Sequence, residues 1–336
     1  MAGIAAEAVA LLQRGDTDAA QTLVGHACDR GDGEALAMRA LWQVEGRLMP
    51  RDLPAARIDL HGAADTGNIV AARMLGGFLA AGVGGPRDWP GAMALLDRWA
   101  SRDPIAAQQR AIIAAMAIDD HGDPLHLPTP VQLSHSPAIH ALPALLSAAE
   151  CDLLATLSER RLRPALIFHE AQARFVADPI RDSDAAGFPI LAEWPAIHAI
   201  NRRLARVSGT GVEQGETLQV LRYRPGQQYR AHLDAVPGLA NQRILTCLVY
   251  LNDDFAGGET CFTRLNLSHR GAKGDGLLFA NCLPDANGLS DKRPDPISEH
   301  AGLPVQSGVK MIASRWIRQG PSTGPDGFGQ HEAQRA

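Results

Sequence analysis

The first 120 residues repeat with a period of 36, and this repeat limits the possible folds more than any other feature of the sequence. The segment MPRDLPAARIDLHGAADTGNIVAA aligns with GPRDWPGAMALLDRWASRDPIAAQ. The residues that recur are Pro50 and Pro86, Arg51 and Arg87, Asp52 and Asp88, and Pro54 and Pro90. One period earlier the chain reaches Asp16, and small residues align through all three segments. Those small residues are Ala20, Ala56 and Ala92, and then Cys28, Ala64 and Ala100.

This repeat predicts stacked pairs of helices over residues 1–120. Small side chains at fixed positions let helices approach closely, and a period in the mid-thirties is typical of such arrays. Asp52 and Asp88 each stand two residues before a proline. That pattern marks a helix start, because Asp caps a helix and Pro is tolerated in its first turn. The segment resembles the Sel-like branch of tetratricopeptide-type repeats, which implies an α-solenoid whose units pack on their neighbours. A generic Ala-rich helical domain is the alternative.

Residues 121–142 differ in composition from the repeats: Pro and His are frequent, and helical periodicity is absent. We interpret this segment as a linker. It contains His121-Gly122-Asp123, a His-x-Asp pattern that stands directly before Pro124. No strand pattern holds this pair on one face, so we expect a solvated turn there and no metal site.

From residue 143 the sequence mixes helix and strand patterns, which predicts a second domain over residues 143–320. Residues 144–162 and 194–209 show the spacing of apolar residues that favours helices. Short runs rich in β-formers follow; they are ETLQVLRY, RILTCLVYLN, GLLFAN and VKMIASRWIR. Gly, Pro, Asn and Asp separate these runs, which predicts an antiparallel sandwich or barrel. Residues 321–336 are polar and rich in Gly and Pro, so we expect a disordered tail.

A second His-x-Asp pattern, His232-Leu233-Asp234, lies in a segment with strand character. Residues two apart on a strand face the same side, so one imidazole and one carboxylate would point together into the barrel. A non-haem Fe(II) site needs two histidines and one carboxylate, with the remaining positions open for substrate and oxygen. His300 is the candidate third ligand. The Asp234 carboxylate would occupy the coordination position on the metal that a halide would need. These three ligands therefore favour hydroxylation over halogenation.

Lys310 lies ten residues beyond His300, at the start of a predicted strand. The residues that would share its face of the strand are Ile312, Ser314 and Trp316. A lysine on the inner face of a barrel is costly unless an anion pairs with it, and a bound dicarboxylate would supply one. An outward-facing lysine is the alternative, and the periodicity does not decide between the two.

Several ordered segments resemble the prolyl 4-hydroxylase group of Fe(II)- and 2-oxoglutarate-dependent dioxygenases. They are YRPGQQYRAHLD, RILTCLVYLNDDFAGGETCF, KGDGLLFAN and HAGLPVQSGVKMIASRWIR. The resemblance covers residues 138–319 and includes Arg181–Ser183. Met311 departs from it, because relatives often carry an aromatic residue at this position. That departure concerns the shape of the substrate pocket and not the set of candidate ligands.

The resemblance implies a double-stranded β-helix (jelly roll) with flanking helices, and therefore a two-domain α+β fold together with the N-terminal α-solenoid. It implies that His232, Asp234 and His300 ligate Fe(II). Lys310 would hold the distal carboxylate of 2-oxoglutarate. Further cosubstrate contacts would be Tyr223, Thr246 and Tyr250, for each of which ordinary core packing is the alternative. The implied cofactors are Fe(II), 2-oxoglutarate and O2, with ascorbate as a candidate reductant.

The resemblance also implies hydroxylation of an amino-acid residue, with proline in a peptide or protein as the leading candidate. Stacked helical repeats expose extended surfaces that suit polypeptides, so we expect the array to capture the substrate. One alternative is a free or carrier-bound amino acid or a small peptide natural product. The other is a protein-interaction scaffold with an incidental oxygenase domain, which the complete set of candidate ligands disfavours.

Composition argues against several other classes of protein. Net charge is −5 without a long basic run, so we expect no nucleic-acid partner. No apolar stretch approaches the ~20 residues of a membrane span. The N-terminus lacks a basic start, and Glu7 interrupts its apolar run, so we expect no signal peptide. The five scattered cysteines include no Cys-x-x-Cys pair, which disfavours a zinc site or a disulfide framework and favours a cytoplasmic protein.

Overall fold

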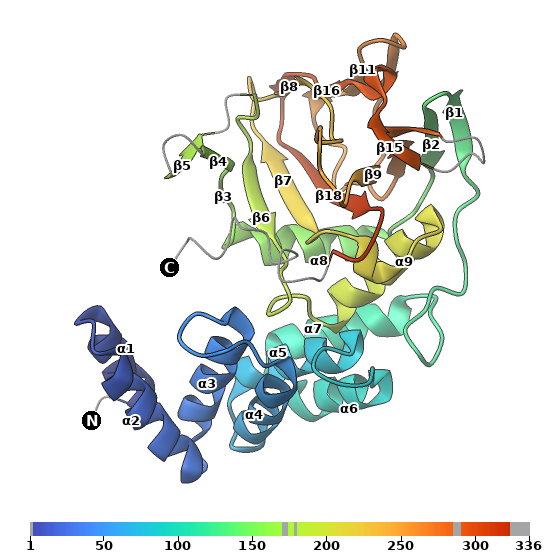
Figure 1. Ribbon diagram of the computed structural model, residues 1–336. Coiled ribbons are helices and arrows are strands. Elements are labelled where there is room, and N and C mark those ends of the chain that lie inside the picture. Colours follow the sequence, from blue (N-terminus) through green and yellow to red (C-terminus); the bar gives the residue numbers. More distant parts are fainter. Residues whose placement is uncertain (1–2, 170–173, 178–179, 285–289, 323–336) are drawn as a thin grey trace. The chain divides into compact units, whose positions relative to one another are not determined.

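The computed structural model describes residues 3–169, 174–177, 180–284 and 290–322. The chain divides into two compact units, Met1–Leu125 with Ile190–Ala199 and His126–Pro189 with Ile200–Ala336. The first unit is helical, and the second consists mainly of strands (Figure 1). Within the described residues, no helix has both the length and the apolar character needed to cross a membrane. The predicted tail lies outside the described residues from residue 323 onward.

The first unit is a series of helices that follow the period of the sequence (Figure 1). They are α1 (Ile4–Gln13), α2 (Thr17–Asp29), α3 (Gly33–Glu45), α4 (Leu53–Asp65), α5 (Ile69–Ala81), α6 (Trp89–Trp99) and α7 (Pro104–Ala115). The helices α2, α4 and α6 begin at residues 17, 53 and 89, and α3 and α5 begin at residues 33 and 69. Corresponding helices therefore start 36 residues apart, which confirms the predicted repeat of helix pairs.

The predicted helix-start signals function as caps. Asp52 accepts a hydrogen bond from a backbone N–H in the first turn of α4, and Asp88 does the same for α6. A proline stands in the first turn of each helix. The aligned residues Ala20, Ala56 and Ala92 are fully buried. The small side chains thus lie inside the array, where they allow close packing between helices.

Two ion pairs with buried carboxylates connect helices of this unit. Arg39 on α3 forms two 2.7 Å hydrogen bonds with Asp59 on α4. Arg73 on α5 binds both carboxylate oxygens of Asp103, at 2.7 and 2.6 Å, and Asp103 also caps α7. The guanidinium groups keep partial exposure, whereas the carboxylates are buried. Each buried carboxylate is therefore compensated by a bidentate partner, as such a charge requires.

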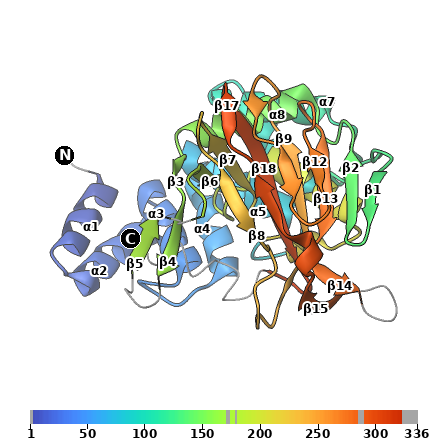
Figure 2. The same cartoon turned by 90° about the horizontal axis from the view of Figure 1, so that it is seen from above.

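The second unit contains two main antiparallel sheets, and Figure 2 shows β7, β18 and β9 side by side in the larger one. The strand order of the larger sheet is β1-β2-β13-β9-β18-β7-β6-β3. These strands are β1 (Val131–His135), β2 (Ala138–Leu142), β13 (Gly276–Ala280), β9 (Arg243–Tyr250), β18 (Lys310–Arg318), β7 (Gln219–Tyr223), β6 (Asp184–Gly187) and β3 (Arg163–Pro164). The smaller sheet orders β12 (Leu267–His269), β11 (Thr260–Phe262), β16 (His300–Gly302) and β8 (Tyr229–His232).

Two-stranded ribbons and two helices complete the architecture. The ribbons pair β10 (Ala256–Gly257) with β17 (Val305–Ser307), β14 (Cys282–Pro284) with β15 (Ser290–Pro294), and β4 (Leu166–His169) with β5 (Arg174–Ala177). Ser147 and Glu150 form a capping box at the start of α8 (Ala148–Glu159). The helix α9 (Pro195–Ser208) ends before Gly209, whose φ is 68°. Both helices agree with the spacing in the sequence, and glycine suits this left-handed conformation after a helix.

An apolar cluster lies between the two main sheets. Phe262 on β11 meets Phe279 on β13 edge to face, with ring centroids 5.1 Å apart. Other buried members of the cluster are Ile139, Leu221, Leu248, Leu277 and Ile312. Both phenylalanines also contact the ring of His300. The two-domain α+β fold with a jelly-roll core is therefore confirmed, and its core reaches one of the candidate metal ligands.

Part of the segment predicted as a linker is β-structure. The strands β1 and β2 lie within residues 121–142, and β2 pairs with β13 over Ile139–Leu142. Ile139 and Leu142 are fully buried. The linker prediction is therefore wrong for residues 131–142. Frequent Pro and His obscured two alternating patterns that are only five residues long, too short to identify as strands by periodicity.

Candidate metal centre and cosubstrate pocket

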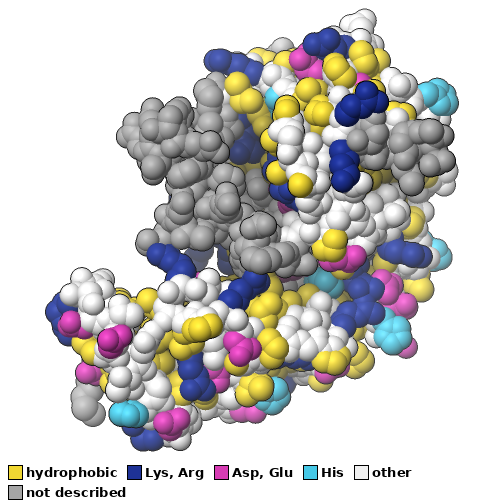
Figure 3. Space-filling model, in the orientation of Figure 1, with side chains coloured by type: hydrophobic (Ala, Val, Ile, Leu, Met, Phe, Trp, Pro, Cys, Tyr) yellow, Lys and Arg dark blue, Asp and Glu magenta, His cyan; other side chains and the backbone are white. Residues whose placement is uncertain are grey.

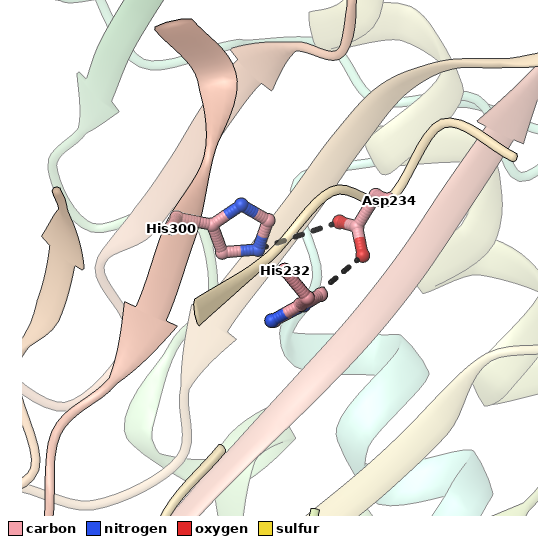
Figure 4. Close-up of side chains that lie close together, drawn as sticks. All are labelled: His232, Asp234 and His300. Atoms are coloured by element: carbon pink, nitrogen blue, oxygen red, sulfur yellow. Dashed lines mark ion pairs between the residues drawn. The ribbon is translucent and has the colours of Figure 1, made fainter. Parts of the chain in front are cut away.

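His232 and His300 lie on neighbouring strands of the smaller sheet, and Asp234 lies in the bend two residues after the end of β8 (Tyr229–His232). His232 ends β8, His300 begins β16, and the two residues are paired across the strands. Nε2 of His232 lies 3.4 Å from Oδ1 of Asp234, and Nε2 of His300 lies 3.6 Å from Oδ2. Figure 4 shows the three side chains pointing toward one another. One potential donor atom from each lies within 4.8 Å of the others, so the predicted group forms a single cluster.

The hydrogen bonds of the two imidazoles leave Nε2 available to a metal. Nδ1 of His232 lies 2.8 Å from the carbonyl oxygen of Arg230, and Nδ1 of His300 lies 3.0 Å from that of Ser298. A carbonyl oxygen only accepts, so each Nδ1 carries a proton, and in a neutral imidazole Nε2 then keeps its lone pair. In the part of the chain that the structure describes, Nε2 of His232 is buried without a hydrogen-bond partner. This donor set fits a non-haem Fe(II) centre.

The electrostatics of the cluster favour the protonation states that a cation needs. Burial alone would raise the pKa of Asp234, but His300, His232 and the Thr246 hydroxyl hold that pKa well below its ordinary value. Burial lowers the pKa of His300, and the Asp234 carboxylate only partly opposes this effect. Near neutral pH the carboxylate is therefore ionised and His300 is neutral. Metal ligands must be in these deprotonated forms.

Thr246 contacts the carboxylate of the cluster. Its hydroxyl donates a 2.6 Å hydrogen bond to Oδ2 of Asp234 and accepts a 2.9 Å bond from the side-chain amide of Asn281. The predicted contact between Thr246 and the cosubstrate stays a prediction. No periodic pattern in the sequence points to Asn281, because this residue lies in the connection between β13 and β14.

A cavity between the two main sheets adjoins the cluster. Its apolar walls are Leu221, Leu248, Ile312 and Trp316. Its other lining residues include Tyr223, Tyr229, Thr260, Lys310 and Ser314. The residues predicted to share one face of the last strand, from Lys310 to Trp316, all line this cavity. A charged group, hydroxyl groups and an apolar wall thus meet beside the candidate ligands.

Lys310 points into the cavity, which decides between the two orientations that the sequence left open. Its Nζ is buried and donates a 2.6 Å hydrogen bond to the carbonyl oxygen of Gly258. Gly257 and Gly258 have φ values of 71° and 68°, and a Cβ at Gly257 would lie 2.5 Å from the oxygen of Pro304. Glycine is therefore required in the turn that brings this carbonyl to the lysine. Burial lowers the pKa of Lys310 to about 8.

The two tyrosines with predicted cosubstrate contacts lie in different environments. Tyr223 pairs with Lys310 across β7 and β18 and lines the cavity. Burial raises the pKa of Tyr223 to about 12, so its hydroxyl stays protonated near neutral pH and is able to donate. Tyr250 is fully buried, and its hydroxyl donates to the carbonyl of His269 at 3.0 Å. Among the described residues, Tyr250 is outside the cavity lining, which favours the alternative of core packing.

The other His-x-Asp pattern lies in a turn, as expected. His121 is exposed, and the backbone N–H groups of His121 and Asp123 donate to the carboxylate of Asp119. Within residues 3–169, 174–177, 180–284 and 290–322, the cluster on the smaller sheet is the one group of three or more side chains that could hold a metal. His121 and Asp123 are therefore not brought together with a third candidate ligand.

Comparison with known proteins agrees with this geometry. The family described as the 2OG-Fe(II) oxygenase superfamily matches residues 218–318, which contain the three candidate ligands and Lys310. Prolyl 4-hydroxylase 1 of Arabidopsis thaliana is 34% identical over an alignment of 209 residues, and the match covers 56% of this chain and 72% of that relative. The protein is thus an Fe(II)- and 2-oxoglutarate-dependent dioxygenase. Within this class, the chain belongs to the prolyl 4-hydroxylase family.

Two solved structures are also similar to this chain. A viral collagen prolyl hydroxylase from Paramecium Bursaria Chlorella virus-1 shows 29% sequence identity and a TM-score of 0.41, covering 54% of this chain and 95% of its own. A Sel1 repeat protein from Oxalobacter formigenes shows 30% identity and a TM-score of 0.28, covering 29% of each chain.

Proposed function

We propose that the protein hydroxylates proline in a peptide or protein, with Fe(II) held by His232, Asp234 and His300. One observation carries the proposal: these three side chains converge beside a cavity that also contains an inward-facing lysine. The relation to prolyl 4-hydroxylases supports proline as the target residue.

The residues of the cluster would fix the geometry of the reaction. When bound, Fe(II) and 2-oxoglutarate would supply the oxidising chemistry that inserts one oxygen atom of O2 into a C–H bond. Asp234 offers an ionised carboxylate, and each histidine offers Nε2 while its Nδ1–H is held by a backbone carbonyl. Protein donors would occupy three coordination positions, which leaves the others for the cosubstrate and O2.

Lys310 would bind the distal carboxylate of 2-oxoglutarate, and Tyr223 would donate a hydrogen bond beside it. A buried ammonium group requires an anion. Among the described residues, Lys310 has the carbonyl of Gly258 as a hydrogen-bond partner and no acidic side chain at ion-pair distance. Apolar side chains such as Leu221 and Ile312 wall the same cavity. They would exclude water, and the lower local dielectric would strengthen the attraction between lysine and carboxylate.

The direct test supplies the purified protein with Fe(II), 2-oxoglutarate and a panel of proline-containing polypeptides. We expect succinate to form in step with a product that is heavier by one oxygen atom. Fragmentation of that product in a mass spectrometer should place the oxygen on proline. Hydroxylation of a free amino acid without hydroxylation of any polypeptide would contradict the proposed polypeptide substrate. It would favour the alternative of a free amino acid as substrate.

The helical repeats would capture the polypeptide. Stacked helices present extended surfaces, and this array exposes the apolar side chains Ile58 on α4 and Val70 on α5. On the face shown in Figure 3, side chains of both charge signs are interspersed over the helices. A surface of mixed charge suits a polypeptide better than a polyanion. Charged replacements at Ile58 and Val70 test this proposal, because they should weaken polypeptide binding and spare the chemistry.

Two further proposals concern the conditions of catalysis. We propose ascorbate as an added reductant; omitting it should shorten the linear phase of 2-oxoglutarate consumption, and an unchanged time course would contradict this. We also propose a reducing compartment such as the cytoplasm, because the five cysteines are scattered through the sequence and include no Cys-x-x-Cys pair. Fractionation of cells that produce the tagged protein tests this point, and recovery from an oxidising compartment alone would refute it.

A further inference from the structure

A buried relay of hydrogen bonds ends on Asp234. Asn281 is fully buried, and its Nδ2 donates to Oγ1 of Thr246 at 2.9 Å. Thr246 is also buried and donates to Oδ2 of Asp234 at 2.6 Å. The relay therefore runs from an amide, through one hydroxyl group, to the carboxylate of the candidate metal site.

The chemistry of the three groups fixes the direction of this relay. An ionised carboxylate only accepts hydrogen bonds, so the single hydroxyl proton of Thr246 must point to Asp234. The Thr246 oxygen can then accept on its other side, where the NH2 group of Asn281 lies. With Oδ2 held by Thr246, the carboxylate keeps Oδ1 on the side of His232, 3.4 Å from Nε2.

The backbone of Asn281 connects to the segment that carries His300. Its carbonyl oxygen accepts a 3.0 Å hydrogen bond from the N–H of Asp295, and the carbonyl oxygen of Asp295 accepts a 2.7 Å bond from the Ser298 hydroxyl. The carbonyl oxygen of Ser298 accepts from Nδ1 of His300. Asn281 is therefore linked by short chains of hydrogen bonds to both Asp234 and His300.

Packing alone does not explain an amide at position 281. Within the described residues, Oδ1 of Asn281 is buried without a hydrogen-bond partner. Burying an unpaired amide oxygen is unfavourable, and an apolar side chain at this position would not carry that cost. The amide must therefore provide something that an apolar side chain does not, and its described contact is the donation to Thr246.

We propose that Asn281 is a positioning residue for the metal centre. It orients the Thr246 hydroxyl, which in turn holds Asp234 in the conformation that presents Oδ1 to the metal. This inference rests on the proposed iron site. Removal of such outer partners typically weakens metal binding about ten- to a hundredfold. The metal-free fold needs no such orientation, so its stability should change little.

The test compares Co(II) binding by metal-free wild-type protein, Asn281→Leu, Thr246→Val and the double variant, followed by the visible absorption of bound Co(II). Each single variant should bind Co(II) about tenfold or more weakly. Because the two residues act in series, the double variant should bind no more weakly than Thr246→Val. Thr246→Ser retains the hydroxyl and should bind Co(II) as the wild type does.

Asn252→Ala is the matched control. Asn252 bonds to the backbone of Val309 and Met311, and in the described structure it bonds to none of the candidate ligands. The Asn252→Ala variant should bind Co(II) with the same affinity as the wild type. Thermal unfolding of the metal-free proteins checks the fold of every variant, and Asn281→Ala replaces Asn281→Leu if the latter does not fold.

Wild-type Co(II) affinity in the folded Asn281 variant would overturn the inference, and so would losses that add in the double variant. Failure of the wild type itself to bind Co(II) is a separate result, because it would remove the proposed iron site and not only the role of Asn281.

Discussion

Lys310 is a buried ammonium group whose hydrogen bond in the described structure goes to a neutral carbonyl oxygen, that of Gly258. Lys310→Ala should therefore weaken 2-oxoglutarate binding while metal binding persists. A charge-assisted hydrogen bond contributes roughly 1.5–3 kcal/mol, which corresponds to about a ten- to hundredfold loss of affinity. Calorimetric titration of the metal-loaded protein with 2-oxoglutarate measures the change. Unchanged affinity would show that another cation anchors the cosubstrate.

Because of the same lysine, we expect the affinity for 2-oxoglutarate to depend on pH. Burial lowers the pKa of Lys310 from 10.5 to about 8. Below pH 8 the free enzyme holds the ammonium form and binds the dicarboxylate fully. As pH rises through 8 the amine loses its charge, so the Kd for 2-oxoglutarate should rise, approaching about tenfold per pH unit. Lys310→Arg stays charged and should remove this alkaline limb. If the Kd for 2-oxoglutarate still rises with pH in Lys310→Arg, a group other than Lys310 causes the pH dependence.

The residues of the site differ in how far the sequence could predict them. His232, Asp234 and His300 were predicted as a group because their residue types define the coordination chemistry. Thr246 and Tyr250 were placed on the correct strand, but alternation indicates a face and not which atoms a side chain reaches. Asn281 carries no pattern of its own, and its role depends on contacts between segments that are distant in the sequence.

At the level of the helices, ion pairs stabilise the array, and the carboxylates of these pairs differ in how deeply they are buried. Arg73→Met should lower the free energy of unfolding by roughly 3 kcal/mol, because it leaves the buried Asp103 carboxylate without its partner. Arg98→Met is the matched control, since Arg98 pairs with Asp65 at an exposed position, where the loss should stay below about 1 kcal/mol. Denaturant unfolding compares the two. Equal losses would mean that burial does not set the contribution of these pairs.

Elements that recur or that carry end signals could be predicted from the sequence. The array was predictable because its capping residues and small residues recur with one period. The short strands were not, because strands such as β16 contain only three residues and are defined by pairing, as between His300 and His232. The hairpin of β1 and β2 was missed for the same reason, since its place beside β13 depends on a long-range contact.

For the whole molecule, the repeats should matter to polypeptide capture and not to the chemical step. Ile58 and Val70 are 72% and 55% exposed, so replacing both by Asp should leave the fold intact. We expect this double variant to raise the KM for a polypeptide substrate while substrate-free consumption of 2-oxoglutarate stays unchanged. Val131→Asp, at a residue of the second unit that is 50% exposed, is the control. Wild-type KM in the double variant would exclude this surface from substrate capture.

Metal binding by the intact chain tests the central claim most directly, because every other role depends on the site formed by His232, Asp234 and His300. Anaerobic Fe(II) titration, with bound metal counted after gel filtration, should give one ion per chain for the wild type and for His121→Ala. The same measurement should show sharply weakened binding in His232→Ala, Asp234→Ala and His300→Ala. Iron binding that survives the loss of His232 but falls in His121→Ala would show that the metal belongs to the other His-x-Asp pair.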